Sequence, residues 1–204
     1  MRFLLTGFAP FGQSTVNPSY EAVRAMPSRL GEHEIYTAEI PVTYADAPAV
    51  LLEAVERLRP HCVLALGQAA GREGISLENT AVNVKAASAP DNAGVVFQGE
   101  KVEEDGPESL SVNLPLKELL AALEEEKIPA KISYSAGTYV CNTLLYSLLS
   151  YIKRENSSLL GGFVHIPIDE GQAADFPEGT PTMPLKDVVR ALTILVSVLG
   201  AKEQ

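Results

Sequence analysis

Short apolar runs alternate with segments of helical period along most of the chain. The runs are nearly continuous in apolar residues, which is typical of strands that are buried on both faces of a sheet. Five or six strands are predicted in this way, at residues 2–6, 34–39, 62–66, 75–84, 131–135 and 162–166. Strands that alternate with helices predict an α/β fold, a three-layer α/β/α sandwich around an open, mostly parallel twisted sheet.

Between these runs, apolar residues recur at helical spacing. One stripe, which predicts a helix with Asp46 as its N-cap, consists of Val50, Leu51, Ala54, Val55 and Leu58. Similar stripes predict helices at residues 116–126, 141–153 and 185–199, and Asn17-Pro18 predicts a further helix start. A chain of 204 residues with these elements is expected to form a single domain over residues 1–204.

Two stretches fit neither pattern, residues 85–108 and 167–184. Both are rich in Gly, Pro and acidic residues and are longer than typical connections, so they are expected to carry sites or subunit contacts. The first contains an apolar patch, Val95-Val96-Phe97. This patch predicts either a contact between subunits or a hairpin that packs onto the body of the protein.

Composition excludes several functional classes. With 26 acidic against 16 basic residues, the net charge is −10, which repels nucleic acids and anionic membranes. The first apolar run has one basic residue and stops at Gly7, which is too short for an export signal or a spanning helix. Two cysteines far apart in sequence indicate a reducing compartment, so the expected location is the cytoplasm.

Cys141 is the candidate nucleophile. It opens an apolar-striped helix directly after a strand and a glycine turn, where unpaired N–H groups are expected to favour the thiolate and to bind an oxyanion. The sequence around it leaves a second interpretation open, a small buried apolar residue. Cys62 lies inside a strand-like run and is predicted to be core.

His165 is the candidate base, because it lies near the carboxyl end of a predicted strand, where open α/β sheets place their sites. A packed histidine with one hydrogen bond is the alternative. His33 lies between glutamates and is predicted to be solvated, and His61 stands at the entry to a strand. Glu78, within a strand-like segment, differs from the other acidic residues, which lie in helices or loops.

Four motifs stand out along the chain. They are Thr6-Gly7-Phe8-Ala9-Pro10-Phe11-Gly12, Gly67-Gln68-Ala69-Ala70-Gly71-Arg72 with Glu78 after it, Ser135-Ala136-Gly137-Thr138-Tyr139-Val140-Cys141-Asn142, and Gly161-Gly162-Phe163-Val164-His165-Ile166-Pro167. Together they resemble the type I pyroglutamyl peptidases, also called pyrrolidone-carboxylate peptidases, over nearly the whole length.

The resemblance implies a cysteine exopeptidase that removes an N-terminal 5-oxoproline from peptides, without a cofactor or metal, as a homo-oligomer of two or four chains. It implies a catalytic triad of Glu78, Cys141 and His165. It also implies a substrate pocket formed by Phe8, Phe11, Gln68, Tyr139 and Val140. For Phe8 and Phe11, ordinary core packing is the alternative.

Two departures from the family pattern bear on the site. Asn79 and Thr80 follow Glu78 where the family usually has arginine and valine, which predicts the loss of a contact that supports Glu78. Ala89 precedes Pro90-Asp91-Asn92 where the family tends to have a bulky apolar residue, which predicts a wider pocket if that wall is shared. A cysteine amidohydrolase of different small-amide specificity, or a catalytically silent binding protein on the same fold, therefore stays open as an alternative.

Overall fold

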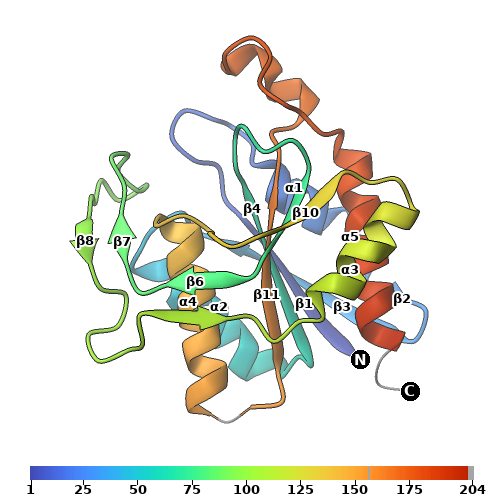
Figure 1. Cartoon of the computed structure of the whole chain (residues 1–204), viewed down its shortest axis with the longest axis horizontal. Coiled ribbons are helices and arrows are strands. Elements are labelled where there is room, and N and C mark those ends of the chain that lie inside the picture. Colours follow the sequence, from blue (N-terminus) through green and yellow to red (C-terminus); the bar gives the residue numbers. More distant parts are fainter. Residues whose placement is uncertain (156, 202–204) are drawn as a thin grey trace.

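The computed structural model describes residues 1–155 and 157–201. A seven-stranded sheet runs through the molecule in the order β10-β5-β11-β4-β1-β3-β2 (Figure 1). Its strands are β1 (Arg2–Phe8), β2 (Arg29–Leu30), β3 (His33–Ile40), β4 (Cys62–Gln68), β5 (Ile75–Glu78), β10 (Ala130–Ser133) and β11 (Leu160–Ile166). Pairing is antiparallel only between β11 and β5 and between β2 and β3. The predicted mostly parallel sheet is confirmed.

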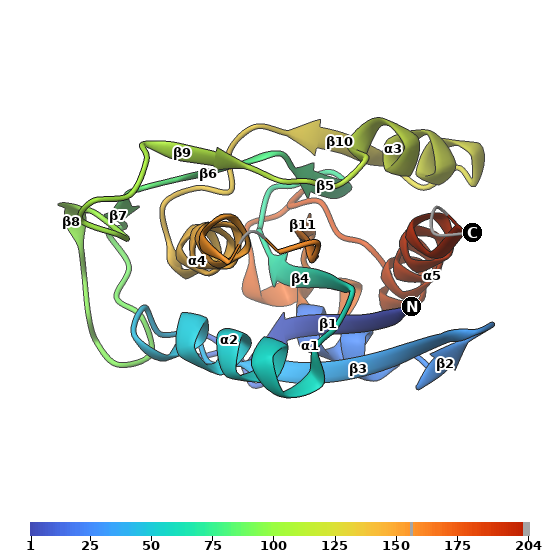
Figure 2. The same cartoon turned by 90° about the horizontal axis from the view of Figure 1, so that it is seen from below.

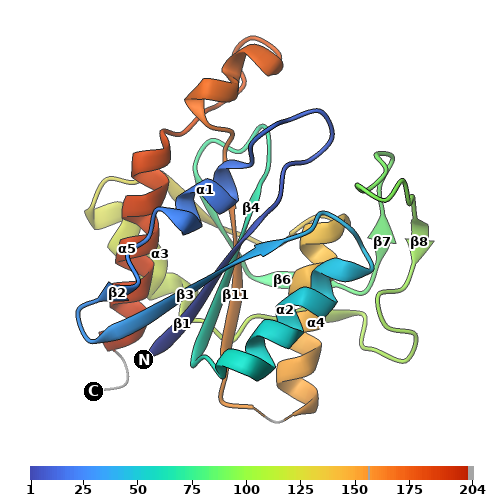
Figure 3. The same ribbon diagram turned by 180° about the vertical axis from the view of Figure 1, so that it is seen from behind.

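Helices cover both faces of this sheet. On one face lie α1 (Pro18–Arg24), α3 (Leu116–Glu125) and α5 (Leu185–Ala201), and on the other lie α2 (Asp46–Leu58) and α4 (Val140–Arg154), side by side (Figures 2 and 3). Successive residues of each strand point to opposite faces, so Phe3 and Leu5 join the first core and Leu4 joins the second. The predicted three-layer sandwich is confirmed, and no helix of the described residues is long and apolar enough to cross a bilayer.

The predicted helix starts hold to within a residue, with one correction. Asn17 caps α1 by accepting a hydrogen bond from the Ser19 N–H at 3.1 Å. The N-cap of α2 is Ala45 and not Asp46, which is already helical. The Asp46 N–H donates to the Thr43 hydroxyl oxygen at 3.2 Å, so the capping oxygen comes from Thr43.

The prediction of a single strand at residues 75–84 is wrong. The strand is interrupted at Asn79, and the next strand, β6 (Thr80–Val82), lies outside the main sheet and pairs with β9 (Ser109–Ser111). The Asn79 N–H still donates to the Ser133 carbonyl of β10 at 2.7 Å, whereas the Asn79 carbonyl accepts from the Val112 N–H, just after β9, at 2.9 Å. Glu78 is therefore the last residue of β5 inside the main sheet.

The two unassigned stretches are mostly irregular. Residues 85–108 form a hairpin of β7 (Lys85–Ala86) and β8 (Gln98–Glu100), and residues 167–184 contain a short 3₁₀ helix, η1 (Glu170–Asp175). Phe97 packs edge-on against Tyr44, with ring centroids 4.9 Å apart, whereas Val95 and Val96 are exposed. The apolar patch is thus divided between the body of the protein and its surface.

Candidate active site

The alternation of side chains along the sheet brings the predicted acid and base to one face. His165 of β11 lies opposite Gly67 of β4 and, on its other side, opposite Ser76 of β5. Glu78 stands two residues after Ser76 in β5, so its side chain points to the same face as His165. This is the face that α4 covers.

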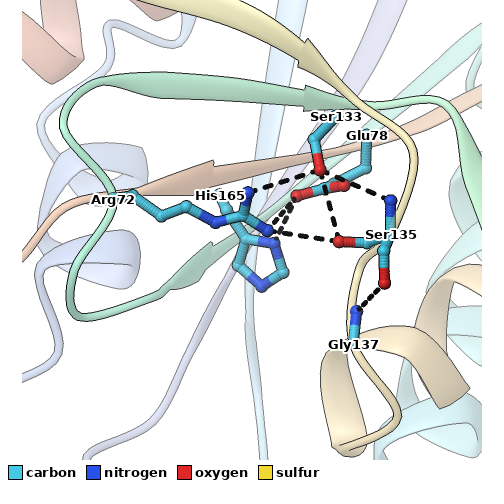
Figure 4. A network of polar contacts seen from close by, with 6 residues as sticks. All are labelled: Arg72, Glu78, Ser133, Ser135, Gly137 and His165. Atoms are coloured by element: carbon cyan, nitrogen blue, oxygen red, sulfur yellow. Dashed lines mark hydrogen bonds and ion pairs between the residues drawn. The ribbon is translucent and has the colours of Figure 1, made fainter.

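Glu78 and His165 form a buried pair. The imidazole Nδ1 lies 2.8 Å from Glu78 Oε1, and the side chains of His165 and Glu78 are 5% and 0% exposed, respectively. A carboxylate at Nδ1 holds the proton on that nitrogen and leaves Nε2 free to accept another. Figure 4 shows the carboxylate of Glu78 against the imidazole ring. The pair therefore has the geometry of a base held in one tautomer.

The thiol of Cys141 lies over Gly67. A Cβ built on Gly67 would stand 3.0 Å from Cys141 Sγ, so the sulfur occupies the space that any larger residue would fill. Gly67 is the register partner of His165 on the neighbouring strand. The structure thus brings Cys141, from the start of α4, to the position on the sheet where His165 and Glu78 lie.

The start of α4 is fixed by hydrogen bonds to the two small sheets. The buried side chain of Asn142 accepts from the Val82 N–H at 2.9 Å and donates to the carbonyls of Val82 and Val84 at 2.8 and 3.0 Å. Just before the helix, the Ala86 N–H donates to the Thr138 carbonyl at 2.9 Å, and the Thr138 hydroxyl donates back to the Ala86 carbonyl. These contacts set the position of the intervening thiol.

The electrostatic environment of Cys141 differs from the expectation. Burial raises the pKa of the thiol to about 12, the hydrogen bond from its own backbone N–H lowers it, and the Glu78 carboxylate raises it. The expected stabilisation of the thiolate by the helix start is therefore outweighed. The thiol is protonated at neutral pH and needs a neighbouring base to become a nucleophile.

A cavity of about 360 Å³ opens in front of Cys141 and is mainly apolar. Its walls include the predicted Phe8, Phe11, Gln68 and Tyr139, and Phe11 meets Tyr139 edge-on with ring centroids 5.6 Å apart. Val140, which was also expected to line the pocket, does not. Its side chain is fully buried in the core between α4 and the sheet, because the helix turns it away from the cavity.

Phe176 and Gln172 are among the residues near the cavity that the sequence analysis did not predict. Phe176, just after η1, lines the cavity. Gln172 accepts a hydrogen bond from the Asp169 N–H at 3.1 Å and donates to the Gln68 side-chain oxygen at 3.3 Å. Because that oxygen is engaged, the amide N–H groups of Gln68 remain to face a ligand. The length of the 167–184 stretch was the only available signal for these residues.

The departures at Asn79, Thr80 and Ala89 have limited consequences in the structure. The Asn79 side chain donates to Thr80 at 3.0 Å, which agrees with the expected loss of a contact from this position to Glu78. Arg72 supports Glu78 from another direction, because its guanidinium lies 3.1 Å from Glu78 Oε1. Ala89 is exposed and does not line the cavity, so the condition for a wider pocket at that position is not met.

The remaining cysteine and histidines lie away from the site. Cys62 is fully buried in the core, as predicted. His33 is half-buried and not solvated as expected, because its ring contacts the amino group of Met1 at 3.1 Å. His61 is exposed and accepts a hydrogen bond from a backbone N–H of β1 at 2.8 Å. Of the three histidines, only His165 is paired with a buried carboxylate.

Comparison with known proteins agrees with this geometry. A model of the family described as pyroglutamyl peptidase matches residues 1–202. The chain belongs to this family. It is 39% identical to the pyrrolidone-carboxylate peptidase of Thermococcus onnurineus, over 96% of this chain and 97% of the relative, and 41% identical to that of Erwinia tasmaniensis, over 100% and 94%.

Solved structures of the pyroglutamyl peptidase family superpose closely on the fold. The crystal structure of Bacillus amyloliquefaciens pyroglutamyl peptidase I is 38% identical, covers 98% of this chain and 97% of that chain, and gives a TM-score of 0.94. A mutant pyrrolidone carboxyl peptidase of Pyrococcus furiosus is 30% identical, the match covers 100% of each chain, and the TM-score is 0.96. The family resemblance seen in the sequence is thus confirmed.

Proposed function

We propose that this member of the pyroglutamyl peptidase family removes an N-terminal 5-oxoproline from peptides through an acyl-enzyme on Cys141. The observation that carries the proposal is the buried Glu78–His165 pair beside Cys141, at the wall of an aromatic cavity. In this proposal Cys141 is the nucleophile and His165 the general base and acid. Glu78 fixes the imidazole and stabilises its protonated form.

The first half-reaction begins from a protonated thiol. As Cys141 Sγ bonds to the carbonyl carbon that joins 5-oxoproline to the next residue, its proton passes to His165 Nε2. The carbonyl oxygen becomes an oxyanion, which backbone N–H groups at the start of α4 stabilise. The C–N bond then breaks, and His165 returns the proton to the leaving amine. The product is a thioester on Cys141 and a shortened peptide.

The second half-reaction restores the enzyme. Water attacks the thioester carbonyl and gives a proton to His165, which returns it to the sulfur as the C–S bond breaks. Free 5-oxoproline leaves with a carboxylic acid formed from the water oxygen. Each step uses the same proton acceptor, so one buried imidazole serves both halves of the reaction.

The cavity suits the acyl group. A 5-oxoproline ring is uncharged, with an apolar edge and one amide edge, so it favours flat hydrophobic walls and few polar partners. Phe8, Phe11 and Tyr139 supply such walls. The amide N–H groups of Gln68 supply a donor for the ring carbonyl. A prolyl ring has no such carbonyl and carries a charged amine, which these walls do not solvate.

The test is turnover of a pyroglutamyl-amide reporter, with prolyl and glutaminyl reporters as competitors. Cys141→Ser and His165→Ala are expected to lose activity at least about 10³-fold, and Glu78→Gln to lose least. Cys62→Ala is the matched control, because it removes the other thiol, and it should keep activity that a thiol reagent still blocks. Activity near wild-type in Cys141→Ser would end the proposal, and a preference for another reporter would assign a different amide specificity.

We also propose a homo-oligomer of two or four chains that works in the cytoplasm. Exposed Val95 and Val96 on the β7–β8 hairpin support a subunit contact. Light scattering gives the oligomeric state, and Val95→Lys should shift it towards the monomer if the hairpin is the contact. Cell fractionation tests the location.

A further inference from the structure

We propose that Arg72 is a positioning residue that holds Glu78 and the loop in front of Cys141 in their working arrangement. The proposal rests on the proposed function, since it assigns Arg72 a part in the same reaction. Arg72 does not line the cavity and touches no reacting atom. Its effect would pass through the residues that it binds.

One guanidinium binds two elements of the site. Arg72 lies in the loop between β4 and β5, and its Nη2 is 3.1 Å from Glu78 Oε1 and 3.2 Å from the Ser135 carbonyl. Its Nη1 is 3.4 Å from the Ser133 hydroxyl, which donates to the Ser135 carbonyl at 3.2 Å. Figure 4 shows the guanidinium between the carboxylate of Glu78 and the chain at Ser133 and Ser135.

The segment that Arg72 binds leads directly to the nucleophile. Residues 134–139 connect β10 to α4, and Ser135 and Gly137 within it are exposed. The Gly137 N–H donates to the Ser135 hydroxyl at 3.3 Å, so the contact with Arg72 continues towards the helix. Thr138 holds the same segment from the side of β7. Arg72 holds this segment from the side of the main sheet, through the Ser135 carbonyl.

The charge of Arg72 has a second consequence. Glu78 is fully buried, its Oε2 has no hydrogen-bond partner among the residues that the structure describes, and Arg72 is a fixed cation against it. A buried carboxylate without a counter-ion is costly. Planar guanidinium groups can bind several acceptors at once, whereas a lysine ammonium is a point charge. Arg72 thus offsets the cost of burying Glu78, which in turn holds the imidazole of His165.

The experiment compares Arg72→Met, Arg72→Lys and Arg190→Met. Arg190 pairs with Glu126 on the surface between α3 and α5, so its removal is a matched control for losing an arginine ion pair. We expect Arg72→Met to lower kcat about 10- to 100-fold with KM changed less than about threefold, because the base is no longer held in its working position. Arg72→Lys should restore only part of kcat, and Arg190→Met should change neither kcat nor KM.

A readout independent of turnover separates this proposal from the proposed function. The Nδ1–H proton NMR signal of His165, assigned by its loss in His165→Ala, should shift or broaden in Arg72→Met, because Glu78 is no longer held in place, and should keep its position in Arg190→Met. An unchanged signal and an unchanged kcat, or a loss of thermal stability alone, would overturn the role of Arg72. Absence of turnover in the wild-type protein would overturn the proposed function, while the NMR signal would still decide on Arg72. If Arg72→Met does not fold, the kcat of Arg72→Lys decides, and wild-type kcat there would refute the need for a guanidinium.

Discussion

Adding one methyl group at Gly67 should disturb the nucleophile more than it disturbs the fold. In Gly67→Ala the new Cβ would stand 3.0 Å from Cys141 Sγ and 2.8 Å from Cζ of Phe163. Favourable contacts begin at about 3.5 Å, so the sulfur has to retreat by about half an ångström and the ring by slightly more. Both shifts fall on the face of the sheet that carries His165.

The expected magnitudes follow from these shifts. A displacement of about 1 Å at a reacting atom can cost about 10²-fold, so a loss of about 10- to 100-fold in kcat/KM is expected, equivalent to about 1.4–2.7 kcal/mol in the barrier. Overpacking costs about 1–3 kcal/mol of stability. Replacing glycine within a strand returns up to about 1 kcal/mol of that, so the protein should still fold.

The assay is kcat/KM on a pyroglutamyl-amide reporter, below the melting temperature of every variant. Gly161→Ala is the control, because its Cβ would press on the ends of Ile152 and Leu148, at 2.6 and 3.1 Å, on the same helix α4. It should lose stability yet keep kcat/KM within about twofold. Wild-type kcat/KM in Gly67→Ala, or an equal loss in Gly161→Ala, would refute the placement of the sulfur over Gly67.

Three further predictions concern stability and binding. Because burial raises the pKa of Cys141 from 9.0 in the unfolded chain to about 12, its contribution to stability is complete below about pH 9 and is lost as the pH rises towards 12. The unfolding free energy of Cys141→Ala in urea should therefore fall less over that range than that of wild-type. Asn142→Ala should lose about 2–4 kcal/mol in the same assay, since three hydrogen bonds to β6 and the residues after it disappear, and an unchanged midpoint would contradict this. Gln172→Ala should raise KM about three- to tenfold with kcat nearly unchanged, because it releases the Gln68 amide, and an unchanged KM would show that the amide is held otherwise.

Long periodic segments made much of the fold predictable. The strands of the main sheet and the helices that cover it follow from apolar runs and stripes, whose period can be recognised without knowing how the elements pack. The break at Asn79 could not be predicted, because the apolar run continues through it and the change of partner depends on a distant residue, Val112, whose N–H donates to the Asn79 carbonyl. The prediction of Asp46 as the N-cap of α2 failed because the Thr43 hydroxyl, and not the Asp46 carboxylate, accepts the hydrogen bond at the start of this helix.

At the site, the motifs led to residues that lie together, and the errors concern orientation and solvation. Val140 adjoins the nucleophile in sequence, but the helix turns its side chain into the core. Phe176 reaches the cavity from a distant loop, which no local pattern reveals. The helix start argued for a thiolate at Cys141, whereas the pKa depends on how much water the finished fold excludes.

The protonated sulfur of Cys141 also bears on chemical durability. Peroxides oxidise thiolates much faster than thiols, and progress beyond sulfenic acid is largely irreversible. A resting enzyme whose thiol keeps its proton should therefore survive oxidants that inactivate peptidases with a standing thiolate. In the proposed reaction the sulfur loses its proton only when a substrate is bound, and the occupied cavity then excludes the oxidant.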